Sequence, residues 1–330
     1  MILTKENFAQ RYPGLAPTTY AALRLWLDQL DARSYGSTQY WRDLSRLGNH
    51  FEQATADNQP SIAGPSRVFD GTNDYLQQET LYSNASVACT IVLTAGSASL
   101  LVTGVSLTPY AGKFVRVYDG AKYAWGYITT GAGPIVSTVG GATQNWTGQE
   151  AGFNVGAATF KVEIFEPRLN ILGSMTILAW IKPNDGQPAA TQILLSRWTT
   201  ATNRALILRL ETTGKLSFVV SPDGVNYGTE STNTAVFANG TVSWKHIAAV
   251  YDGAGEAFIY TNGALVASTE FGSFGTTIFD TFAELRIGVN AGTTSPFAGS
   301  IAQVMIFAGA LSAAEIRRIY LRDLPRYQVA

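Results

Sequence analysis

Hydrophobic and polar residues alternate in short runs along most of the chain, and glycine-containing turns separate the runs. Alternation with a period of two is typical of strands that bury one face, whereas a helix buries residues three to four apart. Such a pattern of many short strands predicts an all-β sandwich or barrel. Five pairs have the composition of hairpin turns: Asp70-Gly71, Asp119-Gly120, Asp223-Gly224, Asp252-Gly253 and Asn262-Gly263.

The second half of the chain carries the clearest strand pattern. The predicted strands are Thr176–Lys182, Ile193–Trp198, Leu206–Glu211, Lys215–Ser221, Lys245–Tyr251, Glu256–Thr261, Glu284–Val289 and Ser300–Phe307. One short C-terminal helix is expected after them, because Ser312 and Glu315 form a capping box before Ile316 and Ile319. Near the N-terminus, periodicity alone does not decide between a helix from Tyr20 and a strand over Leu23–Asp28.

Residues 82–168 form a distinct block that is rich in Gly, Ala, Val and Thr. Its own alternating runs are enough for a small β domain: Thr90–Thr94, Leu100–Val105, Lys113–Tyr118, Lys122–Thr129 and Thr159–Phe165. A domain inserted in a surface loop is tolerated because the entropy of closing a loop grows slowly with its length.

Net charge, apolar runs and cysteine content disfavour several classes of protein. The formal net charge is -1, so the chain has no basic footprint for nucleic acid. No apolar run is long enough to span a bilayer, and the N-terminus lacks the pattern of a signal peptide. The single cysteine, Cys89, permits no disulfide within the chain and is expected in the core.

Four segments resemble the concanavalin A-like, laminin-G-like jelly-roll family. They are the stretches Val68–Leu76, Met175–Pro183, Trp244–Ala267 and Phe297–Ile316, which keep the family's order and spacing. Leu25–Asp28 and Trp41–Ser45 are similar to segments that precede this domain in phage and bacterial surface proteins, which favours a strand over Leu23–Asp28. The resemblance implies a concanavalin A-like jelly-roll sandwich.

The resemblance also suggests domain boundaries. We expect a jelly roll formed by residues 23–81 and 169–330, interrupted by the small inserted β domain at 82–168. Within the insertion, Leu107–Asp119 resembles small β modules of phage tail and fibre proteins. Residues 1–22 are expected to be an attachment arm, because Tyr12–Pro17 is turn- and polyproline-prone and would become ordered on a partner.

The carboxylates of the chain are the candidates for catalytic and metal-binding residues. Glycosidases of this superfamily need two carboxylates close together on one strand, and no such pair is present, so we expect no enzymatic activity. Members of the fold often bind calcium through loop oxygens, which Asp70, Asn73 and Asp74 could supply. The alternative is that Asp70 only shapes the turn and that Asn73 or Asp74 caps it. Calcium is therefore a possible cofactor that the sequence does not decide.

Carbohydrate recognition requires aromatic side chains that can stack on the apolar faces of sugars. Trp198, Tyr227 and Trp146 lie at predicted strand ends or turns, where binding residues are common. A buried turn aromatic would serve equally well as a packing residue. Trp180 and Trp244 lie in the family's structural strands and are expected in the core.

These observations predict a phage virion protein: a head or tail fibre, appendage or decoration subunit, made in the host cytoplasm. It would act by non-covalent adhesion to host surface glycans, or by attachment to other virion proteins, and as a homo-oligomer. Two alternatives remain open: a bacterial carbohydrate-binding protein outside a virion, and a glycan-degrading enzyme.

Overall fold

The structure is a computed structural model that describes residues 5–94, 97–102, 108–110, 112–128, 146–149, 152–153, 156–199, 203–240 and 242–327. The chain divides into two compact units. The first comprises Met1–Gln78, Ile171–Phe279 and Ala283–Ala330, and the second Glu79–Asn170 with Asp280–Phe282. The second unit overlaps the block predicted as an inserted domain.

The first unit contains an eight-stranded sheet, all of whose described neighbours are antiparallel. Strand β23 pairs along one edge with β13, and along the other with both β1 and β5. The strands, in sheet order, are β20 (Ala264–Leu265), β19 (Ala257–Thr261), β18 (Lys245–Tyr251), β13 (Met175–Pro183), β23 (Ala298–Phe307), β5 (Ser66–Asp70) and β4 (Ser61–Ala63), with β1 (Leu23–Asp28) beside β23.

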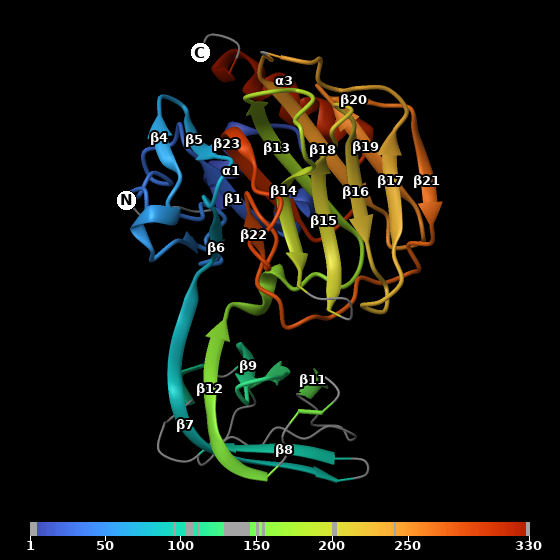
Figure 1. Cartoon of the computed structure of the whole chain (residues 1–330). Coiled ribbons are helices and arrows are strands. Elements are labelled where there is room, and N and C mark those ends of the chain that lie inside the picture. The colour runs from blue at the N-terminus through green and yellow to red at the C-terminus, as the bar shows by residue number, and fades with distance from the viewer. Residues whose placement is uncertain are drawn as a thin grey trace. The chain divides into compact units, whose positions relative to one another are not determined.

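A nine-stranded antiparallel sheet forms the other layer of this unit (Figure 1). Its order is β2 (Tyr40–Trp41), β3 (Phe51–Glu52), β6 (Leu76–Gln78), β22 (Arg286–Ile287), β14 (Gln192–Trp198), β15 (Arg204–Leu210), β16 (Leu216–Val220), β17 (Gly228–Thr232) and β21 (Ser268–Gly272). The predicted strand Glu284–Val289 is shorter than expected, because Gly288 has a φ of 92° and leaves the strand conformation.

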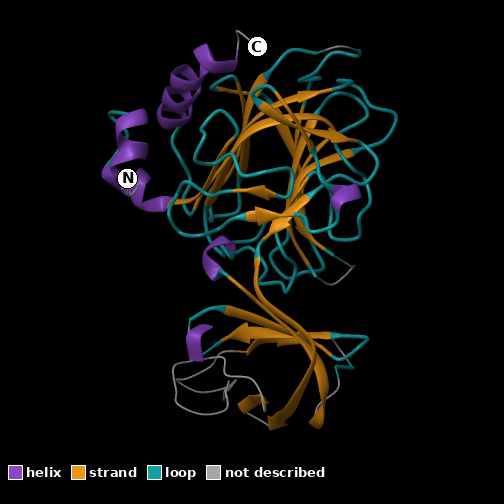
Figure 2. Cartoon of the chain, turned by 90° about the vertical axis from the view of Figure 1, so that its left-hand side faces the viewer, coloured by secondary structure: helices purple, strands orange, loops and turns teal. Residues whose placement is uncertain are grey.

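The centre of the eight-stranded sheet is buried on both faces at β13, which explains the nearly continuous apolar run of that strand. One face carries Leu178 and Met305 against the helices α1 (Lys5–Arg11) and α3 (Ala313–Tyr327). In Figure 2 these helices lie side by side, with α2 (Pro17–Ala22) next to α1. The all-β class, the jelly-roll sandwich and the C-terminal helix are thus confirmed. No helix among the described residues is long and apolar enough to cross a membrane.

The capping box that the sequence predicts is present at the start of α3. The Ser312 amide donates to Glu315 Oε2 at 2.9 Å, and the Glu315 amide donates back to Ser312 Oγ at 3.4 Å. The hairpin turn between β19 and β20 lies against this helix. Asn262 and Gly263 both have positive φ, 50° and 75°, and a Cβ on Gly263 would lie 2.8 Å from the Tyr320 ring. Glycine is therefore required there by conformation and by space.

The N-terminal segment differs from the expected attachment arm. Phe8, Tyr12 and Leu15 are buried in the same apolar cluster as Trp26 of β1. Leu23–Asp28 is a strand, as the family resemblance favours, and the preceding residues form α2. This segment therefore packs on its own domain, and its role in attachment stays a prediction. The sequence-based interpretation missed the packing because the prolines and the glycine interrupt the apolar residues between them.

The second unit contains a six-stranded antiparallel sheet around its own apolar cluster. On β9, Val115 and Val117 point into the cluster, while Arg116 on the opposite face pairs with Glu163 at 2.6 Å. Trp125 donates its indole N–H to the Asp280 carbonyl at 3.2 Å. The strands, in sheet order, are β11 (Trp146–Gln149), β10 (Tyr123–Tyr127), β9 (Phe114–Tyr118), β12 (Gly156–Phe165), β7 (Thr80–Thr94) and β8 (Ser97–Val102). Short 3-10 helices are η2 (Thr108–Tyr110) and η3 (Pro167–Leu169) in this unit and η1 (Ala56–Asn58) in the first unit.

Candidate functional site

Two of the three predicted carbohydrate-binding aromatics lie together on the nine-stranded sheet. Trp198 ends β14, and Tyr227 precedes β17. Their ring centroids are 5.5 Å apart with an interplanar angle of 70°, an edge-to-face pair. Tyr227 is 45% exposed, and Trp198 is partly buried. The strands that separate them in sequence therefore bring them to one surface.

Arg204, at the start of β15, adds a positive charge to this pair. Its guanidinium carbon lies 5.2 Å from the centre of the Trp198 ring and 5.4 Å from that of Tyr227. Both distances are within the range of a cation–π contact. Nη1 donates to the Val225 carbonyl at 2.9 Å, while the buried Nε has no partner among the described residues. Arg204 thus contacts both rings and is tied to the turn that carries Tyr227.

The turn that carries Tyr227 is held by Asp223. Its Oδ1 accepts the amides of Val225 and Asn226 at 2.8 and 2.7 Å, and its Oδ2 accepts Asn226 Nδ2 at 2.7 Å. Burial acts to raise the pKa of Asp223, but the hydrogen bonds from Asn226 and Val225 outweigh it and hold that pKa below its ordinary value. The turn is therefore preorganised through the Asp-Gly signal visible in the sequence.

Trp198 rests on an apolar base formed by the same face of the sheet. Ile193, Ile207 and Val219 are buried and pack together, with Trp198 against them. Ile207 and Val219 are direct cross-strand partners on β15 and β16, so their side chains share a face. Packing against these three side chains holds the Trp198 ring on this face of the sheet.

Phe271 extends the surface toward the edge of the sheet and was not found from the sequence. It pairs with Thr229 across β21 and β17, and Thr229 pairs with Val219 across β17 and β16, so Phe271 lies on the Trp198 side. At 61% it is the most exposed large apolar side chain described. Alternation in Ser268–Gly272 was the available signal, but it does not reveal which face is outward. We call Trp198, Arg204, Tyr227 and Phe271 the aromatic patch.

The third predicted aromatic residue belongs to the other unit. Trp146 begins β11 opposite Gly126, and its side chain falls outside the described part of the structure. The same holds for the side chain of Cys89 in β7. Trp180 is buried beneath α3, as expected for a core residue, whereas Trp244 is only partly buried beside it.

The three predicted calcium ligands form a tight turn after β5. Asp70 Oδ1 accepts the amides of Thr72 and Asn73 at 2.7 and 3.3 Å, and Asp74 Oδ2 accepts the Asp70 amide at 2.9 Å. Asn73 donates to Asn58 Oδ1 at 2.9 Å. Burial raises the pKa of Asp74 to about 6. These contacts fit the turn-shaping alternative, and calcium binding stays a prediction. Among the residues described, no three His, Cys, Asp or Glu side chains are grouped to hold a metal ion.

Part of the chain matches a known protein family. Residues 156–317 match the family model of the concanavalin A-like lectin/glucanases superfamily, which confirms the resemblance seen in the sequence for this part of the chain. A search of curated proteins returned no significant match.

Several solved structures resemble part of the fold of this chain. The carbohydrate-binding module CBM40 of a Ruminococcus gnavus sialidase, bound to α2,3-sialyllactose, is 21% identical, covering 46% of this chain and 84% of its own, with a TM-score of 0.38. Trypanosoma rangeli sialidase is 13% identical, covering 91% of this chain and 33% of its own, with a TM-score of 0.47. A pentraxin from Limulus polyphemus is 14% identical, covering 44% and 69%, with a TM-score of 0.34. These similarities are too low to transfer a ligand or an activity.

Proposed function

We propose that this chain binds glycans non-covalently through the aromatic patch. The observation that carries the proposal is the paired Trp198 and Tyr227 rings, 5.5 Å apart and bridged by Arg204. A sugar presents an apolar face that suits an exposed ring, and hydroxyl groups that suit the polar groups around it. The preorganised turn at Asp223 reduces the conformational entropy lost on binding.

We propose further that binding is the whole activity and that the chain works as a phage virion subunit. Asp223, the carboxylate in the turn that carries Tyr227, is engaged by hydrogen bonds from Val225 and Asn226, whereas glycoside hydrolysis needs two carboxylates at the substrate. The virion role is supported by the inserted block, whose Leu107–Asp119 segment resembles phage tail modules. Attachment to host surface glycans would then be the task of the jelly roll, while other virion proteins or further copies would hold the subunit in place.

Replacing Trp198 by alanine tests the glycan site. We expect binding on a broad glycan array to weaken roughly 30-fold, corresponding to about 2 kcal/mol for a central aromatic contact. The matched control is Tyr35→Ala, which removes an exposed aromatic beside β2, at the opposite edge of the same sheet. Binding that is equal in the two variants, with unchanged melting temperatures, would exclude the patch. A chelator added in parallel tests Asp70, Asn73 and Asp74 as calcium ligands.

Replacing Phe271 by alanine tests how far the site extends. Because Phe271 lies diagonally beyond Tyr227, it can contact only a sugar that continues past the paired rings. We expect a loss of about 1 kcal/mol, roughly fivefold in affinity, for an oligosaccharide of three or more residues. A disaccharide should bind the variant and the unchanged protein equally. Equal losses for short and long glycans would instead place Phe271 at the centre of the site.

A further inference from the structure

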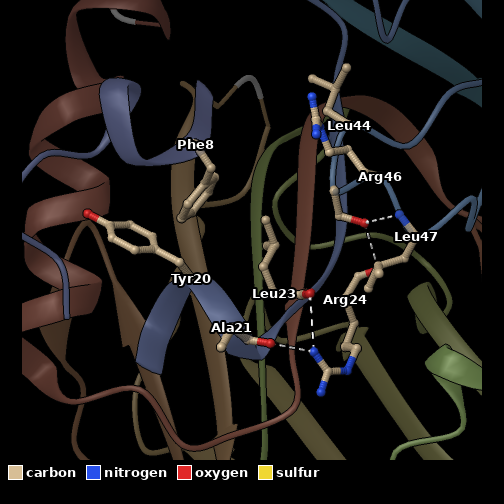
Figure 3. A pocket seen from close by; sticks show the side chains of 9 residues that line it. Phe8, Tyr20, Ala21, Leu23, Arg24, Leu44, Arg46 and Leu47 are labelled. Carbon is tan, nitrogen blue, oxygen red and sulfur yellow. Dashed lines mark hydrogen bonds between the residues drawn. The ribbon is translucent and has the colours of Figure 1, made fainter. Parts of the chain in front are cut away.

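A pocket lies away from the aromatic patch, between the N-terminal helices and the loop that follows β2. Its volume is about 180 Å³. Figure 3 shows Phe8 and Tyr20 on one side and Leu44, Arg46 and Arg24 on the other, with Leu23 between them. An engineered apolar cavity of about 150 Å³ is large enough to hold benzene. The pocket can therefore accept one six-membered ring with a small substituent.

The loop that forms one wall is built around a buried carboxylate. Asp43 Oδ1 accepts the amides of Trp26 and Ser45 at 3.0 and 2.8 Å, and Oδ2 accepts Ser45 Oγ at 2.6 Å and the Asn49 amide at 3.1 Å. These bonds tie the loop to β1. The wall is thus fixed before any ligand arrives, and the charge of Asp43 is directed toward its own loop.

Neither cation of the pocket forms an ion pair with an acidic residue in the described part of the chain. Arg24 Nη1 donates to the carbonyls of Ala21 and Leu23, at 2.7 and 3.3 Å. Arg46 is exposed and makes no ion pair with any described residue. It also has a φ of 71°, which side chains such as arginine rarely adopt. Outliers of this kind often mark ligand sites. No lining residue is Asp or Glu, and the Asp43 carboxylate behind the wall is engaged by its own loop, so the pocket combines an apolar wall with two arginine side chains.

We propose that this pocket binds an apolar ring that carries an anionic group, with the ring against Phe8 and Tyr20 and the anion on Arg46. A guanidinium forms charge-assisted hydrogen bonds with a carboxylate or phosphate. This chemistry could come from a small aromatic acid, or from the terminal carboxylate of a partner chain that ends in an aromatic residue. The site is separate from the aromatic patch and does not depend on the proposed glycan binding.

Titration of the full chain with phenylacetate, followed by calorimetry or NMR, tests the proposal. We expect saturable binding at millimolar concentration, and at least fivefold weaker binding of the neutral isostere phenylacetamide. Arg46→Gly should weaken phenylacetate binding about tenfold. Glycine accepts the positive φ at this position, so the variant should fold at least as well. Arg42→Ala removes an exposed cation of the same segment outside the pocket lining and should leave binding unchanged.

Two further measurements sharpen the test. A tripeptide ending in a free Phe carboxylate that binds tighter than phenylacetate would identify a protein chain as the source, whereas preference for the free acid would identify a small molecule. Trp198→Ala should keep phenylacetate binding, which separates this site from the glycan site. Equal binding of phenylacetate and phenylacetamide, or no binding of either at 20 mM (roughly 2 kcal/mol of affinity), would overturn the proposal.

Discussion

Replacing Asp28 by alanine should lower the free energy of unfolding by about 3–5 kcal/mol, the usual cost of removing one partner from a buried ion pair. Asp28 ends β1 and is fully buried. Its Oδ2 lies 2.7 Å from Arg11 Nη1 and 2.8 Å from Arg326 Nη1. The variant would leave both guanidinium groups without this carboxylate. Urea-induced unfolding at neutral pH measures the loss.

The large effect is expected because one carboxylate joins three distant parts of the chain. Arg11 lies in α1, Arg326 in α3 and Asp28 in β1. A second buried acid, Asp323 of α3, accepts the Tyr12 hydroxyl at 2.9 Å and Arg11 Nη2 at 3.2 Å. Burial raises the pKa of Asp28 and brings that of Asp323 to about 6, although Arg11 opposes both shifts. Burying these charged groups therefore costs desolvation free energy, and removing one of them leaves the others without their partner.

The control for Asp28 is Asp31→Ala, three residues further along the chain. Asp31 pairs with Arg33, whose side chain is 45% exposed, and a pair of this kind contributes at most about 1 kcal/mol. Hydrogen exchange should show faster opening of α1 and α3 in the Asp28 variant only. A loss no larger than that of the control would mean that the network determines specificity without adding net stability.

The sequence predicted the parts of the fold that depend on local chemistry. Asn262-Gly263 has the positive φ values of a hairpin turn, and Ser312 and Glu315 form the capping box. Both predictions succeed because the residues that specify the structure are neighbours in sequence. The apolar run of β13 similarly reports burial on both faces.

The parts that the sequence did not predict depend on long-range contacts. Tyr12 is separated from Asp323 by 311 positions, so nothing near it indicates a buried partner. Arg67 is fully buried, and no carboxylate in the described part of the chain pairs with it. It donates to Gln29 Oε1 at 3.2 Å and to the Thr38 carbonyl at 2.9 Å, and burial lowers its pKa to about 10. Arginine is rarely buried in this way, so composition predicts it at the surface.

The aromatic patch could be predicted from the sequence only in part. Trp198 and Tyr227 could be proposed individually from their positions near turns, because binding residues concentrate there. Their contact with each other, and the role of Arg204 between them, follow only from the register of β14 to β17. Register also decides which face Phe271 occupies, since a shift by one residue would place it on the opposite side.

His246 should make the protein sensitive to acid, and His246→Phe should remove that sensitivity. His246 is fully buried in β18 between Trp180 and Tyr320, at ring distances of 5.5 and 5.7 Å. Neither ring nitrogen has a hydrogen-bond partner among the residues that the structure describes, and burial lowers the pKa of His246 to about 3. Below pH 6.5 the unfolded chain takes up a proton at this residue, whereas the folded chain does not. Stability from the neutral imidazole is therefore complete above pH 6.5 and is lost as the pH falls toward 3.

Between pH 6.5 and pH 5 the free energy of unfolding falls by about 2 kcal/mol because of His246, at about 1.4 kcal/mol for each pH unit. Unfolding free energies of the unchanged protein and of His246→Phe, measured at pH 7 and pH 5, should diverge by that amount in favour of the variant at pH 5. Asp74 and Asp323, whose pKa values burial raises to about 6, act in the opposite direction but are common to both proteins and cancel in the comparison. Parallel pH profiles would show that His246 is protonated in the folded state, and hence that water or a rearrangement reaches its ring beneath α3.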